Sequence, residues 1–262
     1  MSSNSYRPLI AVSPTHLPEK EDIRLATNYT DSIIAAGGTP VILPMTTDET
    51  VIEQIMSCVD GLLLTGGNDI EPELYGVSPT LADGTPNPAI EGLHETTPIR
   101  DTLERTAARC AYQRNLPIRA ICRGMQMIVA LSGGKLICDI KLARKHNDIA
   151  AGDGSIDHSS TDYAAFTHTV TAVPGTRMEK IFGSKPFPVN SIHHQCARSI
   201  NKDCLQVGLV SSDGIIEGVE GNNFLGLQWH PEYFADDNPN NIYSKFFFTF
   251  IEDATHYHSS YN

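Results

Sequence analysis

The sequence of 262 residues lacks a long hydrophobic run: no stretch reaches the roughly 20 apolar residues that a membrane-spanning helix needs. Its first residues, MSSNSYRPLIAVS, contain no basic region followed by an apolar run, so we expect no secretory signal. We therefore expect a cytoplasmic protein that does not act on a membrane.

Basic residues are few as well. The chain has 19 Lys and Arg against 31 Asp and Glu, a net charge of −12, so we expect no nucleic-acid partner. The six cysteines show no CxxC spacing. With no export signal, we interpret them as free thiols in a reducing compartment rather than as a disulfide framework.

Apolar runs alternate with helical patterns in the first half of the chain. Strands that are apolar on both faces, as in a parallel sheet covered by helices, are predicted at 9–12, 40–43, 61–64 and 118–121. Helices are predicted between them, at 23–36, 48–59, 98–115 and 123–131. A further strand is predicted at 135–140, and 68–96 is predicted to be a loop over the carboxyl edge of the sheet, where active sites of open α/β folds lie.

From residue 166 the pattern changes to short alternating segments bounded by turns, which predict antiparallel strands. An amphipathic helix is predicted at 239–254. No repeat or linker divides the chain. We predict one α/β domain over residues 1–262, with a central, mostly parallel sheet and an antiparallel C-terminal extension.

Cys122 lies between the apolar run 118–121 and the helical pattern that follows it. Ala120 and Gly124 flank it, and small neighbours of this kind are typical of a nucleophile elbow, a tight turn that exposes a nucleophile at the head of a helix. A helix N-terminus also favours the thiolate. We therefore predict that Cys122 is a nucleophile.

A thiol nucleophile needs a base, and the base needs a group that orients it. His230 follows the apolar run 224–227, and Glu232 is two residues further, on the same side of an extended segment. The tetrahedral oxyanion formed in acyl transfer needs N–H donors. We predict these from Arg123, directly after the nucleophile, and from the Gly66-Gly67 turn, where glycine lets the backbone approach a ligand.

Several segments resemble the class I glutamine amidotransferase-like hydrolases, and more narrowly the γ-glutamyl-γ-aminobutyrate hydrolase-like group of peptidase family C26. The matching segments are LLLTGGNDIEPELYG (62–76), RDTLE (100–104), AICRGMQMI (120–128), SGGKL (132–136), THTV (167–170), VNSIHHQ (189–195), SSDGIIEGVE (211–220) and GLQWHPE (226–232). The resemblance implies a Cys122–His230–Glu232 triad, a flavodoxin-like three-layer sandwich and no cofactor.

The resemblance also implies a pocket for a γ-glutamyl group near the elbow. The residues expected to line it are Gly66, Asn68, Arg123, Gln126, His193, His194 and Gln195. We predict no metal at His193 and His194, because adjacent strand residues point to opposite faces. Two features depart from the family pattern: Arg119 inside the nucleophile strand, which we expect to face the sheet edge or to pair with an acid, and the insertion at 76–95.

The predicted function is hydrolysis of a small γ-glutamyl amide to glutamate and an amine, through a γ-glutamyl thioester. Three alternatives stay open: a glutaminase subunit that delivers ammonia to a synthase partner, a γ-glutamyl transferase, and a non-catalytic binding protein of the same fold. The sequence names neither the amine nor the oligomeric state, and a homodimer is kept open.

Overall fold

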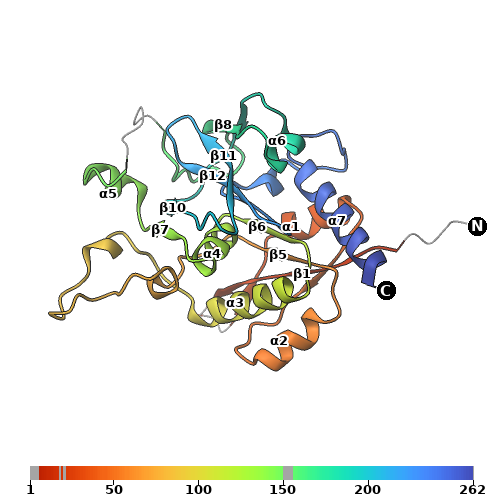
Figure 1. Cartoon of the computed structure of the whole chain (residues 1–262), viewed down its shortest axis with the longest axis horizontal. Coiled ribbons are helices and arrows are strands. Elements are labelled where there is room, and N and C mark those ends of the chain that lie inside the picture. The colour runs from red at the N-terminus through yellow and green to blue at the C-terminus, as the bar shows by residue number, and fades with distance from the viewer. Residues whose placement is uncertain (1–5, 18, 20–21, 150–155, 262) are drawn as a thin grey trace, which may run out of the picture.

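A nine-stranded mixed sheet forms the centre of the computed structural model, which describes residues 6–17, 19, 22–149 and 156–261 (Figure 1). Five neighbouring strands are parallel: β4 (Thr39–Ile42), β1 (Leu9–Val12), β5 (Gly61–Leu64), β6 (Ile118–Ile121) and β13 (Phe224–Leu227). Four antiparallel strands extend the sheet beyond β13: β12 (Ile216–Glu220), β11 (Gln206–Ser211), β8 (His168–Ala172) and β9 (Phe187–Val189). The predicted α/β class, with its antiparallel extension, is confirmed.

Helices cover both faces of the sheet and make the two apolar layers of the core. One face carries α2 (Glu49–Met56), α3 (Pro98–Gln113) and α4 (Arg123–Leu131), and the other carries α1 (Thr27–Ala35), α6 (Arg177–Phe182) and α7 (Lys245–Tyr261) (Figure 1). Side chains alternate between these layers along each strand: on β6, Ala120 packs with the first group and Ile121 with the second.

The pairing of β6 with β13 positions the functional site. These strands are far apart in sequence but run parallel, with Ile121 beside Leu227. Their carboxyl ends therefore lie at the same edge of the sheet. The segments that follow them, which begin with Cys122 and with Gln228, meet at that edge.

Several predicted elements have different limits. The helix expected at 23–36 begins only at Thr27, because β3 (Asp22–Arg24) pairs antiparallel with β2 (Thr15–Leu17). The strand expected at 135–140 ends as β7 (Lys135–Ile137), since Asp139 caps α5 (Ile140–Lys145) through a 2.7 Å bond to the Leu142 N–H. β7 pairs with β10 (Cys196–Ser199) outside the main sheet.

The C-terminal helix was expected from residue 239, but it begins at Lys245. Asp236, Asn238 and Asn241 each accept a hydrogen bond from a backbone N–H two residues on. These Asx turns compete with helical bonding, so the helix starts after them. A short 3₁₀ turn, η4 (Pro231–Tyr233), follows β13.

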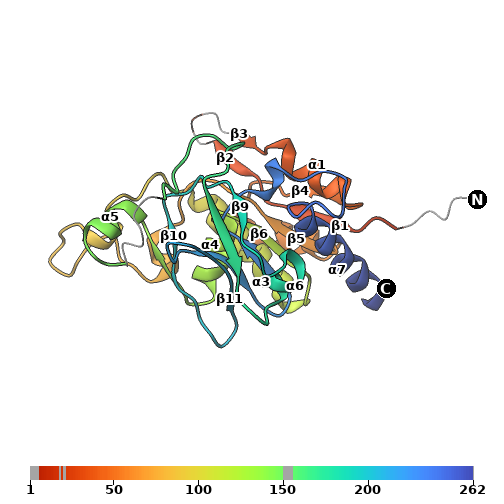
Figure 2. The ribbon, with the colours of Figure 1, turned by 90° about the horizontal axis from the view of Figure 1, so that it is seen from above.

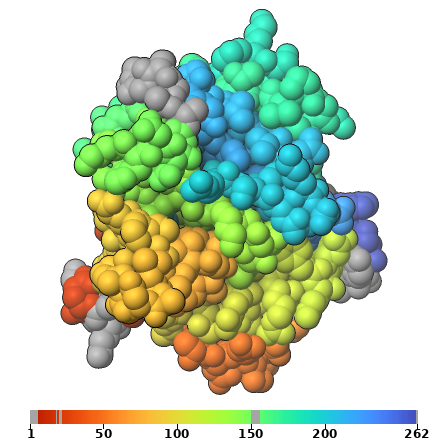
Figure 3. Space-filling view, turned by 60° about the vertical axis from the view of Figure 1, so that its left-hand side comes forward, coloured from red at the N-terminus to blue at the C-terminus, as the bar shows by residue number. Residues whose placement is uncertain are grey.

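The 68–96 segment is irregular, as predicted, apart from the 3₁₀ turns η2 (Pro72–Tyr75) and η3 (Pro88–Ile90). Of this segment, only Asn68 is among the described residues that line the cavity at Cys122. Residues 77–91 instead project to one side, next to β7 and α5 (Figures 2 and 3). No helix in the described part of the chain has the length and apolar character needed to cross a lipid bilayer.

Arg119 is fully buried on the α7 side of β6. Its guanidinium donates to Asp253 Oδ2 at 2.7 Å and lies over the rings of Phe246 and Phe250. The expectation that Arg119 pairs with an acid is confirmed. The pair places a buried charge between β6 and α7 without leaving it uncompensated.

Candidate active site

Cys122 lies in the turn between β6 and α4 with φ 53° and ψ −110°, a left-handed conformation that is rare for a residue other than glycine. Its N–H donates to the Leu227 carbonyl at 2.7 Å, and so the turn is fixed to the end of β13. A Cβ at Gly124 would lie 2.5 Å from the Leu64 carbonyl oxygen. The expected tight turn with a small residue at Gly124 is confirmed, because α4 packs directly on the end of β5.

His230 and Glu232 lie beside Cys122. The Nδ1 atom of His230 is 2.6 Å from Glu232 Oε1, and both side chains are buried. Burial alone would lower the pKa of His230, but Glu232 and the contact with the Cys122 thiol outweigh it and raise this pKa well above its usual range. The imidazole therefore favours its protonated form next to the sulfur.

Tyr29 supports this group from α1. Its hydroxyl accepts a hydrogen bond from the Gly66 N–H at 3.1 Å and lies 3.4 Å from His230 Nδ1. Burial and the nearby Glu232 raise the pKa of Tyr29 well above its usual value, so the phenol keeps its proton. Tyr29 thus connects the glycine turn with the imidazole.

The Gly66-Gly67 turn ends β5 opposite the sulfur. Because the Gly66 N–H is bonded to Tyr29, the N–H of Gly67 is the donor left for a ligand; no partner for it is found within the described residues. Gly67 has φ 153°, and a Cβ there would lie 2.0 Å from Arg100 Nη1. Glycine is required at this position by its conformation and by its close neighbour.

A buried ion network between α3 and the start of α4 supports the Gly66-Gly67 turn. Arg100 donates to the Gly66 carbonyl at 2.9 Å and to Glu104 at 2.9 Å. Arg123 donates to Glu104 and to Asp101. Two arginines therefore face two carboxylates, and the buried charges are balanced. The Arg123 side chain is committed to this network, which leaves its backbone N–H, at the first position of α4, as the group nearest Cys122.

A cavity of about 380 Å³ opens over the sulfur, a volume suited to a small molecule. The residues that line it are Thr15, Leu17, Arg24, Leu25, Ala26, Tyr29, Gly66, Gly67, Asn68, Cys122, Tyr163, Ile192, His230 and Tyr233. Arg24 is the one lysine or arginine among the described lining residues. It comes from β3, the strand that the sequence pattern had not indicated.

Five of the predicted pocket residues do not line this cavity, and one of them is Arg123, whose side chain bonds Asp101 and Glu104. Gln126 donates to the carbonyl of Gln195 and to Gln228, both at 3.2 Å, beneath the elbow. His193 and His194 point in opposite directions, toward Glu217 and Asp69 respectively. Gln195 is buried. From the segment VNSIHHQ (189–195), only Ile192 is among the described residues that line the cavity.

Sequence reasoning missed Tyr29, Asn190, Tyr163 and Arg24. Asn190 bonds the backbone of His230 at both its N–H and its carbonyl. It lies inside VNSIHHQ, a motif already singled out, but the motif does not indicate which residue faces His230. Tyr29 and Arg24 lie in the segment predicted as a helix at 23–36, and its pattern does not indicate which side chains reach the site. Tyr163 lies in a segment without an apolar period.

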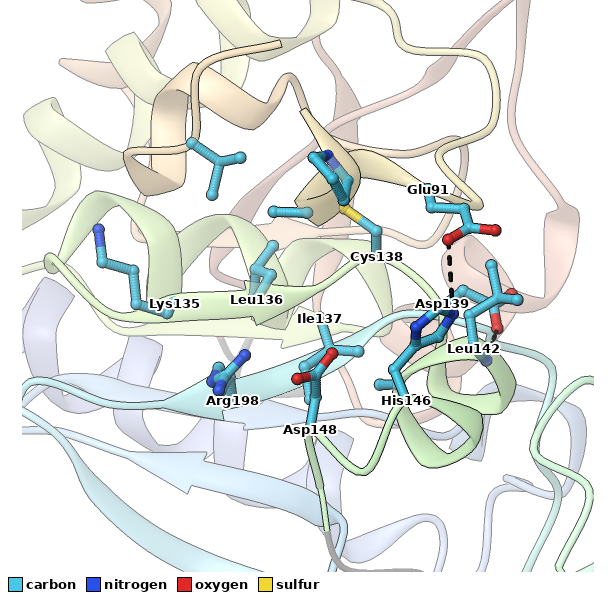
Figure 4. A pocket seen from close by; sticks show the side chains of 14 residues that line it. Glu91, Lys135, Leu136, Ile137, Cys138, Asp139, Leu142, His146, Asp148 and Arg198 are labelled. Carbon is cyan, nitrogen blue, oxygen red and sulfur yellow. Dashed lines mark hydrogen bonds and ion pairs between the residues drawn. The ribbon is translucent and has the colours of Figure 1, made fainter. Parts of the chain in front are cut away.

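A second cavity, of about 440 Å³, lies among β7, α5 and residues 77–91 (Figure 4). Its charges are mixed, since Lys135 and Arg198 line it together with Asp139 and Asp148. None of the residues around Cys122 lines it, so it is separate from the candidate active site.

The family model for Peptidase C26 matches residues 8–232 of this chain. The gamma-glutamyl-gamma-aminobutyrate hydrolase PuuD of Escherichia coli (strain K12) is 32% identical over 218 residues, covering 80% of this chain and 78% of that protein.

Solved structures share the fold at lower identity. The glutaminase domain of Trypanosoma brucei CTPS with bound acivicin has a TM-score of 0.56 at 17% identity, covering 95% of this chain and 94% of that one. A glutamine amidotransferase from Thermotoga maritima has a TM-score of 0.53 at 13% identity, covering 87% and 77%. At these identities the likeness concerns the fold alone.

Proposed function

The chain belongs to the peptidase C26 family, and on this premise we propose that it is a cysteine hydrolase that cleaves the γ-glutamyl amide bond of a small γ-glutamyl compound. The observation that carries the proposal is the arrangement at the sheet edge. A cysteine in a strained turn contacts an imidazole whose other nitrogen is 2.6 Å from a buried carboxylate. This is the arrangement of a thiol nucleophile, its base and an orienting group.

In the proposed first half-reaction, the Cys122 thiolate attacks the δ-carbonyl carbon of the γ-glutamyl group. A carbon–sulfur bond forms, and the negative charge moves to the carbonyl oxygen. The N–H groups of Arg123 and Gly67 are suited to stabilise this oxyanion, since one begins α4 and the other ends the turn after β5. The carbon–nitrogen bond then breaks while the His230 imidazolium donates its proton to the departing amine.

The second half-reaction releases glutamate. A water attacks the thioester, and neutral His230 accepts its proton. The carbon–sulfur bond breaks, and thiolate and imidazolium are restored. Glu232 holds His230 through Nδ1 in both half-reactions, so the same Nε2 atom gives and takes the proton.

Substrate recognition follows from the described lining of the cavity. Arg24 is the group suited to pair with a substrate carboxylate, and Asn68 lies beside the glycine turn with an amide that can bond the glutamyl group. We propose these two residues as substrate contacts, in place of the buried Gln126 and Gln195. A cytoplasmic location remains our prediction, in keeping with six unpaired cysteines.

The test is glutamate release from γ-glutamyl-γ-aminobutyrate, γ-glutamyl dipeptides, a γ-glutamyl anilide and free glutamine. We expect release from at least one γ-glutamyl amide, with glutamine a poor substrate. Cys122→Ala should abolish release, whereas Cys204→Ala, which changes an exposed cysteine, should not. Hydrolysis retained by folded Cys122→Ala would contradict the proposal. Activity on glutamine alone would favour a glutaminase, and transfer of the γ-glutamyl group to an added amine would favour a transferase.

A further inference from the structure

Three histidines and one glutamate meet in the interior, away from the cavity over Cys122. His168 comes from β8 and Glu217 from β12, while His158 and His193 come from the irregular segments on either side of β8 and β9. The four side chains are at most 2% exposed. Neither the predicted triad nor the described lining of the cavity uses any of them.

One carboxylate oxygen lies at the centre of this cluster. Glu217 Oε1 is 3.1 Å from His168 Nε2, 3.4 Å from His158 Nδ1 and 3.7 Å from His193 Nε2. Yet both oxygens of Glu217, and the Nε2 atoms of His168 and His193, have no hydrogen-bond partner among the described residues. The contacts are close but are not aligned as hydrogen bonds, and buried polar atoms are seldom left in this state.

The other nitrogen of each ring is bonded in a way that fixes its proton. His193 Nδ1 lies 2.9 Å from the Gln195 carbonyl, and His158 Nε2 lies 2.9 Å from Asp213; both partners can only accept. His168 Nδ1 lies 3.2 Å from the Thr167 hydroxyl, which itself donates to a backbone carbonyl.

In the neutral rings, the Nε2 atoms of His168 and His193, which face Glu217, therefore carry lone pairs. His158 Nδ1 lies 3.4 Å from Glu217 Oε1 but also 3.1 Å from the Ser191 hydroxyl, which donates to the His158 carbonyl. A buried carboxylate and imidazole lone pairs directed at one point are an arrangement that a metal ion can satisfy. Metal-binding histidines are held in the same way, by a carboxylate or a carbonyl on the second nitrogen.

We propose that His158, His168, His193 and Glu217 bind one divalent ion of the zinc class. Tetrahedral ligands at about 2.0–2.1 Å from zinc lie roughly 3.3 Å apart, and the His168 and His158 separations from Glu217 are close to this value. The ligand atoms of these three residues all lie within 4.8 Å of one another, whereas His193, 3.7 Å from Glu217, lies outside this group and would move inward to become the fourth ligand. Three imidazoles and one carboxylate suit zinc better than calcium or magnesium, which prefer oxygen ligands. Four protein ligands close the coordination sphere, so the ion would be structural.

Such an ion would join the antiparallel half of the sheet to the segment behind the candidate active site. His193 follows closely after Asn190, whose side chain accepts from the His230 N–H and donates to the His230 carbonyl. Ile192, between them, lines the cavity. Binding of the ion would therefore fix residues 190–193 against β8 and β12. This interaction is independent of the proposed hydrolysis and can be measured without a substrate.

The alternative is a network without metal, in which His158 is protonated on both nitrogens and its Nδ1–H points at Glu217 or Ser191. To distinguish the two, the untagged chain is stripped with chelator, incubated with zinc, desalted and analysed by plasma mass spectrometry. We expect about one zinc per chain. Cobalt added instead should give the visible absorption of a tetrahedral site, a measurement on unmodified protein that does not depend on whether variants fold.

Two ligand variants and a matched control complete the test. Glu217→Gln and His168→Asn should lose the bound zinc. His94→Asn should keep it, because His94 belongs to a different group, with Asp69 and His194. If folded wild-type protein retains no zinc and gives no tetrahedral cobalt spectrum, the proposal is wrong and the cluster is a network without metal. It is equally wrong if His94→Asn loses the zinc while Glu217→Gln keeps it.

Discussion

The side chain of Asn190 holds the backbone of His230 at two points. Its amide oxygen accepts from the His230 N–H at 2.9 Å, and its amide nitrogen donates to the His230 carbonyl at 3.2 Å. A further bond from the same nitrogen to the Tyr163 carbonyl, at 2.8 Å, fixes the amide itself. The imidazole is thus positioned through its own main chain as well as through Glu232.

This relationship predicts that Asn190→Ala lowers kcat with little change in KM. The substitution removes both bonds to His230 and the bond to the Tyr163 carbonyl. It leaves Arg24 and Asn68, the proposed substrate contacts, in place, so it should displace the imidazole with little effect on substrate binding. A displacement of about 1 Å can cost about 100-fold in rate. Steady-state kinetics on the best γ-glutamyl substrate will measure the split between kcat and KM.

Asn240→Ala, which changes an exposed asparagine, is the control and should behave as wild type. A folded Asn190→Ala variant with unchanged kcat would show that Glu232 alone positions the base.

Glu232→Gln should move the alkaline limb of the kcat/KM profile to lower pH. Burial tends to lower the pKa of His230, and Glu232 is the largest of the influences that raise it. Without this carboxylate the imidazolium loses its proton at lower pH, and the thiolate–imidazolium pair is lost with it. We also expect kcat to fall by about 100-fold or more, the contribution of a positioned acid or base. If the alkaline limb of the kcat/KM profile lies at the same pH in Glu232→Gln as in wild type, this role of Glu232 is wrong.

The same raised pKa gives a stability prediction with a definite sign. The folded state holds the His230 proton more tightly than the unfolded chain, whose histidines titrate near 6.5. The stabilisation is therefore fully present below about pH 6.5 and is lost as pH rises through the raised pKa of His230. Urea unfolding at a series of pH values above 6.5 should show that the free energy of unfolding falls less with rising pH in Glu232→Gln than in wild type.

Local patterns in the sequence were sufficient to predict the sheet and the turn at Cys122. Apolar runs indicated β1, β4, β5 and β6 within a residue or so. β1, β5 and β6 are buried on both faces and so need mainly apolar side chains, whereas β4 is the partly buried edge strand. The turn at Cys122 was predictable because its small neighbours are themselves a local requirement. The spacing of two residues predicted that Glu232 reaches His230, although the segment is the 3₁₀ turn η4 and not extended as expected. The closeness of both residues to Cys122 follows from the pairing of β6 with β13.

The surroundings of the site could not be read in this way. Tyr29 belongs to a helix whose period shows only that this side chain is buried, and its hydroxyl meets Gly66 and His230 through tertiary packing. Arg24 lies in a hairpin of two three-residue strands, too short and too polar to give an alternating pattern. Contacts of this kind depend on partners 37 to 201 residues away.

Arg24→Gln should raise KM by about tenfold or more and leave kcat nearly unchanged. Arg24 is the only lysine or arginine among the described residues around the cavity, and a carboxylate on the substrate would lose its charged partner. The change removes binding common to the ground state and the transition state. Arg105→Gln, an exposed arginine on α3, is the matched control. An unaltered KM for Arg24→Gln would show that Arg24 does not bind the substrate carboxylate.

Arg119 and Asp253 offer a stability test remote from the chemistry. Burial lowers the pKa of Arg119 to about 10 even though Asp253 opposes the shift, so the guanidinium is still charged at neutral pH. Asp253→Ala leaves this charge buried between β6 and α7 without its carboxylate. Removing one partner of a fully buried pair costs about 3–5 kcal/mol, and because Asp253 is 31% exposed we expect about 1–3 kcal/mol.

Arg119→Met should cost less than Asp253→Ala, although it removes the same ion pair. Methionine can fill the space between the rings of Phe246 and Phe250, and no buried charge remains. In that background Asp253→Ala should have a small effect, limited to the loss of the bond from Arg177. Urea unfolding of the two single variants and the double variant gives the coupling energy directly. If the stability losses of the two single variants add up in the double variant, the stability of buried Arg119 does not depend on Asp253. The loss in Asp253→Ala would then come from the packing of α7 alone.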